Sequence, residues 1–143
     1  MHARLTVLRT ALNFLGALLF AFFAWLQRED DNPEIYVEPS RVDIVLWMVF
    51  YGLVACLFAA VALRRFPPRW PFLGVALLGV YHLAGTLPGF LENLSGGLEM
   101  AQHSMSPERA EVELSREFFG VLLALAATAL IRMQCPAEDQ DQR

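Results

Sequence analysis

Charged residues are scarce in this chain of 143 residues, and lysine is missing altogether. Only 18% of the residues are charged and 56% are hydrophobic, whereas a soluble domain carries about a quarter charged residues. The eleven basic residues are all arginines, and they form no basic run interleaved with aromatic residues of the kind that binds nucleic acid. The composition argues against a soluble domain and against a nucleic-acid partner. It indicates a protein whose solvent is largely lipid.

Cysteine is also rare, and the usual catalytic motifs are missing. Cys56 and Cys135 lie far apart without CxxC spacing, which argues against a disulfide framework, a zinc site or a thiol-redox pair. The sequence contains no P-loop, GxGxxG or HExxH motif and no Ser/His/Asp constellation. We therefore expect no enzymatic activity, no cofactor and no metal site.

Long apolar runs dominate what is present. A helix needs about 20 mostly apolar residues to cross a hydrocarbon core about 30 Å thick. Four segments meet or approach this length, and none of the loops between them is long enough for a separate soluble domain. The sequence predicts one all-α domain over residues 1–143, an integral membrane four-helix bundle. Its predicted spans are residues 5–26, 44–63, 72–91 and 112–131.

The fourth span is the most unusual. Its uncharged part, Phe118–Ile131, is too short to cross the membrane alone. Ser106-Pro107-Glu108 has the residue types of a helix start, with a capping serine, a proline in the first turn and an acidic residue. A helix that spans the membrane from about Val112 would carry Glu113, Arg116 and Glu117 to the edge of the hydrocarbon.

The arginines also predict an orientation. With four spans, both chain ends and the loop around Arg64 and Arg65 lie on one side of the membrane, and seven of the eleven arginines fall there. An excess of arginine marks the cytoplasmic side. We therefore expect an N-in/C-in protein of a bacterial inner membrane, with both termini in the cytoplasm.

Polar residues are predicted to gather at the outward ends of the spans. On a helical wheel Asn13 shares a face with Gln27, and the small residues Gly120, Ala124 and Thr128 continue the face of Glu117 toward a neighbouring helix. Two interpretations stay open: a hydrogen-bonded clasp that fixes helix packing, or an outward-facing binding site. The predicted polar cluster consists of Asn13, Gln27, Asp30, Trp47, Tyr51, His82, Arg116 and Glu117.

The third span contains one ionisable residue, His82, predicted to lie near the middle of the membrane at a depth comparable to Asn13. A neutral histidine that hydrogen-bonds to Asn13 or to a backbone carbonyl is one interpretation; a proton relay or a haem ligand is the other. Near the end of this span, Gly85 and Gly89 form a GxxxG pattern around Pro88, which predicts close helix packing and a kink.

Several of these residues form a pattern that resembles the transmembrane protein 220 family. The resemblance extends from about Ala11 to Ile131 and implies a four-span membrane protein without an established activity. Its motifs are an asparagine in the first helix, Q-x-N-D-x-D at and after the end of that helix, W-x3-Y in the second helix and R-E-x-x-G in the fourth. Here these positions are Asn13, Gln27, Asp30, Trp47, Tyr51, Arg116, Glu117 and Gly120. This chain has Glu29 in place of the asparagine of the second motif.

The sequence favours a structural or partner-binding role in the membrane. The expected partners are the lipid bilayer and either another membrane protein or a second copy of the chain. The alternative is a small transporter or channel-like subunit that binds a cation or polar solute through Glu117 and Asp30.

Overall fold

All four predicted spans are helices. The computed structural model describes residues 2–29, 40–97 and 109–135, and no strand occurs among them. Each of the four long helices is long and apolar enough to cross a membrane, so the prediction of a four-helix membrane protein is confirmed. Residues 106–108, the predicted start of the last helix, lie outside the described residues. The helices are α1 (His2–Leu26), extended by the short η1 (Gln27–Glu29), α2 (Arg41–Ala62), α3 (Arg69–Ser95) and α4 (Ala110–Gln134).

The helix ends carry charges that match the helix dipole. Asp43 lies in the first turn of α2, Glu111 and Glu113 lie in the first turn of α4, and Arg132 lies in its last turn. Acidic residues near the start of a helix and basic residues near its end are both stabilising, by about 0.3–1 kcal/mol each at exposed positions. These charges help to set where α2 and α4 begin and where α4 ends.

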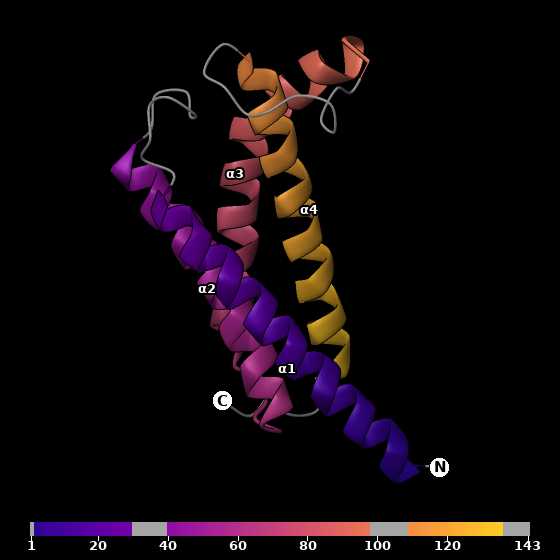
Figure 1. Cartoon of the computed structure of the whole chain (residues 1–143). Helices are drawn as coiled ribbons and strands as arrows, with labels where there is room; N and C mark the ends of the chain where they lie inside the picture. The colour runs from indigo at the N-terminus through magenta and orange to yellow at the C-terminus, as the bar shows by residue number, and fades with distance from the viewer. Residues whose placement is uncertain (1, 30–39, 98–108, 136–143) are drawn as a thin grey trace.

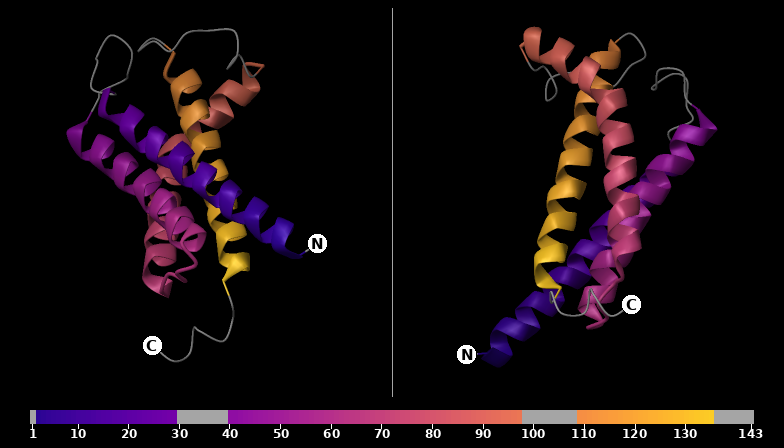
Figure 2. Two further views of the ribbon diagram at one scale, coloured as in Figure 1. Left: turned by 60° about the horizontal axis from the view of Figure 1, so that its bottom comes forward. Right: turned by 180° about the vertical axis from the view of Figure 1, so that it is seen from behind.

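The helices form two antiparallel pairs. α1 packs along α2, and α3 packs along α4; α2 also contacts both α3 and α4 (Figures 1 and 2). The second helix therefore joins the two hairpins, and α1 lies at the periphery. The fold is a pair of helical hairpins that share α2 as their central element.

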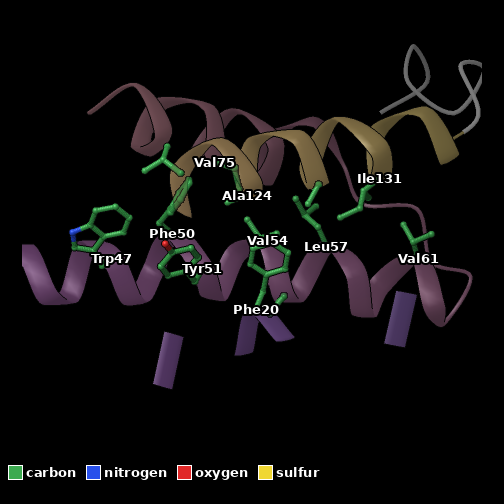
Figure 3. Packing of buried hydrophobic residues seen from close by; sticks show 13 residues of the cluster. Phe20, Trp47, Phe50, Tyr51, Val54, Leu57, Val61, Val75, Ala124 and Ile131 are labelled. Atoms are coloured by element: carbon green, nitrogen blue, oxygen red, sulfur yellow. The ribbon is translucent and has the colours of Figure 1, made fainter. Parts of the chain in front are cut away.

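The hydrophobic core is centred on α2, as Figure 3 shows. Phe50, Val54 and Leu57 point from one face of α2 toward α4 and are at most 1% exposed. Phe20 of α1 covers the core from the other side, and its ring stacks on Tyr51 with the centroids 6.2 Å apart. One helix thus supplies most of the buried apolar surface that holds both hairpins together.

Both described chain ends lie at the same end of the molecule, and the first turns of α1 extend past the end of α4 (Figures 1 and 2). We call this end the arginine end. It contains no acidic residue among those described, and its arginines are Arg4, Arg9, Arg64, Arg65, Arg69 and Arg132.

α3 bends near its C-terminal end (Figures 1 and 2), and Pro88 lies inside the helix there. A proline cannot donate the backbone hydrogen bond that continues a helix, and its ring crowds the preceding turn. The predicted kink is therefore present. It turns the last residues of α3, which include Asn93, across the start of α4, where Asn93 and Ser115 are hydrogen-bonded.

Candidate functional site

Trp47 and His82 form the centre of the candidate site, between α2 and α3. Their rings stack with centroids 3.7 Å apart and an interplanar angle of 21°. The indole Nε1 of Trp47 donates a hydrogen bond to Oδ2 of Asp43, one turn earlier in α2, at 3.1 Å. The stacking puts His82, in the middle of α3, level with the second turn of α2.

The imidazole of His82 is almost completely enclosed. It is 2% exposed, and the rings of Phe50 and Tyr81 lie 5.4 and 5.2 Å from it, centroid to centroid. The backbone of Leu46 lies beside the ring. The ring's Nε2 is buried and has no hydrogen-bond partner among the described residues. Asn13, one of the two predicted partners of a neutral His82, instead bonds to Gln134.

Tyr51 extends to α4 the group of rings formed by Trp47, Phe50, Tyr81 and His82, and we call these five residues the aromatic cluster. Its ring stacks on Trp47 at 5.6 Å, and its hydroxyl lies against the backbone of Gly120. A side chain at position 120 would overlap the tyrosine oxygen. Gly120, Ala124 and Thr128 all lie on the face of α4 that packs inward, and the hydroxyl of Thr128 donates to the Ala124 carbonyl at 2.8 Å. The predicted stripe of small residues on α4 thus packs against Tyr51 at Gly120.

Asn13 belongs to a different cluster, at the arginine end. Its side-chain nitrogen donates to Oε1 of Gln134 in α4 at 3.0 Å, and Nε of Arg9 donates to the same oxygen at 2.8 Å. Arg9 also donates from Nη2 to the Gln134 carbonyl at 3.0 Å. We call these three residues the end clasp. It fastens α1 to α4. Asn13 therefore bonds to α4, and not to Gln27, with which Asn13 shares a face of α1.

Three further predicted polar residues lie at the other end of the molecule. Gln27, Arg116 and Glu117 are each half-buried there. Asp30 lies outside the described residues. The structure brings Trp47, Tyr51 and His82 together and places Gly120 against them. It separates this group from Asn13.

Polar contacts between α3 and α4 were not part of the predicted cluster. The Asn93 side chain donates to the Ser115 hydroxyl at 2.9 Å, and both residues are at most 2% exposed. Glu113, in the same turn as Ser115, is only 7% exposed. The sequence gives only a weak signal that Glu113 is buried, because acidic residues in the first turn of a helix usually face solvent and stabilise the helix end.

The two glycines of the GxxxG pattern behave differently. A Cβ at Gly89 would lie 2.5 Å from Leu114 of α4, so this glycine permits close packing of α3 on α4. Gly85 is exposed and has nothing within 4 Å of a Cβ position. Gly79 and Gly16, which the pattern does not include, provide further close approaches, to Leu125 and Phe58.

With this geometry in view, the comparisons with known proteins decide the family. A family profile described as "Transmembrane family 220, helix" matches residues 19–133, which is most of the chain. The chain belongs to transmembrane family 220. No curated protein and no solved structure matches the chain.

The family 220 match includes the aromatic cluster and the start of α4. Trp47, Tyr51, His82 and Gly120 all lie inside the matched residues. Asn13 and Arg9, two members of the end clasp, precede the match. The aromatic cluster therefore lies within the region that matches the family profile. The residues of the end clasp lie outside that region.

Within the described residues, no group of three or more His, Cys, Asp or Glu side chains is placed to hold a metal ion. The site instead combines a stacked Trp47–His82 pair, a carboxylate on the indole nitrogen and a tyrosine hydroxyl against a helix backbone. Such an arrangement can fix three helices at one depth through stacking and hydrogen bonding.

Proposed function

We propose that the protein is a non-enzymatic, partner-binding component of a bacterial inner membrane, with both termini in the cytoplasm. The arginine end supports this orientation, because six described arginines and no described acidic residue lie beside both described chain ends. Membrane proteins keep such an excess of arginine on the cytoplasmic side. The partner is another membrane protein or a second copy of this chain.

The observation that carries the proposal is the peripheral position of α1. Only 11% of its most apolar stretch is buried, against 28–33% for the other three helices. Helices of a compact four-helix bundle each pack on two neighbours, whereas among the described residues α1 packs mainly along α2 and reaches α4 through the end clasp. Its outer surface, which includes Leu15, Leu18 and Phe22, is available to a helix from another polypeptide.

A photo-crosslinking experiment tests this proposal. A photoreactive amino acid replaces Leu15 or Leu18 on α1, and a matched control replaces Leu130 on α4, which is also exposed and apolar. Irradiation of native membranes is expected to give one discrete protein adduct from the α1 positions and none from position 130. Lipid adducts alone at all three positions would contradict the proposal.

A small transporter or channel-like subunit is the second candidate. The observation that favours it is the acidic character of the interior at the start of α4, where Glu113 is 7% exposed and Glu117, one turn later, is half-buried. Carboxylates inside membrane spans cost a few kcal/mol unless they are paired or hydrated, and they often mark ion or solute pathways. In this proposal Glu117 binds a cation or polar solute together with Asp30, which lies outside the described residues.

The two candidates differ in what Glu117→Gln does. A transporter loses uptake or efflux in this variant while its folded yield and thermal stability in detergent stay unchanged. A carboxylate that only fastens the helices gives the opposite result, with lower yield or stability and no transport phenotype. That second result would remove the transporter proposal and leave the partner-binding proposal standing.

A further inference from the structure

An open groove lies at the arginine end, between the first turns of α1 and the segment that follows α2. It encloses about 400 Å³, within the range of pockets that hold small ligands. The groove lies on the side of α1 that faces the end of α2, and it includes none of the residues of the aromatic cluster or the end clasp. Its lining residues are Thr6, Val7, Thr10, Ala11, Phe14 and Arg64.

The lining is almost wholly apolar. Val7, Ala11 and Phe14 form its wall along α1. The exposed Arg64 borders this wall and brings a positive charge to the groove. A ligand that fits this lining has one hydrocarbon portion and one anionic portion, because arginine binds phosphate and carboxylate oxygens through paired hydrogen bonds.

The position of Arg64 is fixed by the end of α2. Its backbone nitrogen donates to the Val61 carbonyl at 3.0 Å, and the nitrogen of Arg65 donates to the Ala60 carbonyl at 2.8 Å. These bonds close the last turn with Arg64 at a φ of 56°. The guanidinium of Arg64 has no ion-pair or hydrogen-bond partner among the described residues, whereas Arg9 bonds to Gln134 and Arg132 lies over the ring of Phe72.

The surroundings favour a membrane lipid as the ligand. Arg9, Arg65 and Arg69 lie at the same end as Arg64, and no acidic residue is described there. These arginines lie at the ends of the spans, where lipid headgroups meet water. Tryptophan is also enriched at this membrane boundary, and Trp70, at the start of α3, is exposed. Basic pockets between membrane helices are recognised binding places for anionic headgroups.

We propose that this groove binds one anionic phospholipid, with its phosphate on Arg64 and an acyl chain along Val7, Ala11 and Phe14. The proposal depends neither on a protein partner nor on the orientation of the chain. Leu18 lies one turn beyond Phe14 on the same face of α1, so the groove continues into the exposed outer surface of the helix.

Native mass spectrometry of the purified full chain in a neutral detergent tests the proposal. The probes are phosphatidylglycerol and phosphatidylcholine with identical acyl chains. Phosphatidylglycerol is expected to give a single bound lipid in preference to phosphatidylcholine. The variant Arg64→Gln should bind phosphatidylglycerol about fivefold more weakly, which is the effect of one arginine near a membrane surface. Arg65→Gln, which removes the same charge outside the groove, should bind as the unaltered protein does.

A second pair of variants tests the apolar wall without altering charge. Ala11→Phe fills the groove and should remove the bound lipid, whereas Ala21→Phe, at an exposed position farther along α1, should leave it. Helical circular dichroism checks that both variants are folded. This pair decides the question if Arg64→Gln does not fold.

Three results would overturn the proposal. Equal weakening by Arg64→Gln and Arg65→Gln would show attraction to a diffuse positive surface. Retention of the lipid in folded Ala11→Phe would place the lipid elsewhere. Displacement of phosphatidylglycerol by inorganic phosphate at millimolar concentration, with no effect of Ala11→Phe, would assign the site to a free anion.

Discussion

At the scale of single residues, Gly120 and Tyr51 set how closely α2 and α4 approach. The tyrosine hydroxyl occupies the space that a Cβ at position 120 would need. Overpacking of this kind destabilises a well-packed interior because neighbouring side chains must leave their preferred rotamers. The glycine of the R-E-x-x-G motif at the start of α4 is therefore explained by its packing against Tyr51.

Gly120→Ala is expected to lower the free energy of unfolding by about 1–3 kcal/mol, the usual cost of overpacking. The double variant Gly120→Ala/Tyr51→Phe should recover most of this loss, because the nearest remaining ring carbon lies 3.7 Å from the added methyl group. Thermal unfolding in detergent measures both. Gly52→Ala is the matched control, since nothing lies within 4 Å of a Cβ there. If the two alanine variants unfold at the same temperature, the Tyr51 contact is not a packing limit.

Cys135 gives a second prediction at this scale. It follows the last residue of α4, and burial raises the pKa of its thiol, while the positive charges of Arg132 and Arg9 oppose that rise. A raised pKa means less thiolate at neutral pH, and the thiolate is the reactive form. Removing Arg132 takes away part of the opposition, so the pKa rises further and the thiolate fraction at neutral pH falls.

Maleimide labelling of Cys135, in a Cys56→Ser background, should therefore be slow at pH 7 and accelerate as the pH rises. Arg132→Gln should slow the labelling at pH 7 by about twofold to fivefold, as expected for one charge near a protein surface. The difference should vanish at a pH well above the thiol pKa. A difference that persists at high pH would mean that Arg132 acts on access to the thiol and not on its charge state.

At the scale of the helices, polar contacts select which elements meet. Asp43 aligns Trp47 for stacking on His82 between α2 and α3, Asn93 and Ser115 join α3 to α4, and the end clasp joins α1 to α4. Inside a membrane, hydrophobic side chains do not distinguish a neighbouring helix from lipid, so packing and interhelical hydrogen bonds determine helix association.

The end clasp should show this as a measurable coupling. In a double-mutant cycle, Asn13→Ala and Gln134→Ala are expected to couple by about 0.6–1.7 kcal/mol, the range for hydrogen bonds between membrane helices. Unfolding in detergent measures each corner of the cycle. A parallel cycle of Gln134→Ala with Thr128→Ala is the control, because the Thr128 hydroxyl bonds within its own helix. Equal coupling in the two cycles would mean that the clasp contributes no specific contact.

Hydropathy predicted the elements but could not predict their pairing. Each predicted span falls within a helix or ends one residue beyond it, because about 20 apolar residues have only one stable form in lipid. The partners of Asn13 were not predictable in the same way. Helix arithmetic places Asn13 and Gln27 on one face, but the inclination of α1 brings Asn13 to the end of α4 and leaves Gln27 at the opposite end (Figure 1).

Asp43 illustrates the same limit within the site. An acidic residue in the first turn of α2 is already explained by its favourable interaction with the helix dipole. The hydrogen bond from Trp47 gives Asp43 a second role. The spacing of four residues between Asp43 and Trp47 is the signal that could have found it, since such pairs are neighbours on a helix surface. The stacking of Trp47 on His82 depends on the offset between α2 and α3, which no spacing within one helix contains.

At the scale of the whole molecule, the account depends on α1 being the peripheral helix of two joined hairpins. In water this arrangement would expose a large apolar surface that includes Leu15, Leu18 and Phe22. In a membrane that surface faces lipid at no such cost, and it remains available to a partner helix. The architecture and the proposed role thus rest on the same feature of α1.

Oxygen accessibility of spin labels tests this claim most directly. Single labels are attached at Leu15 and Leu18 on α1, at exposed Leu130 on α4 and at buried Val54 on α2, in the purified chain reconstituted at no more than one copy per lipid vesicle. The account predicts that both α1 labels are as accessible to oxygen as the label at 130, and that the label at 54 is protected. Protection of positions 15 and 18 to the level of position 54 would show α1 packed inside a closed bundle, and would contradict the account.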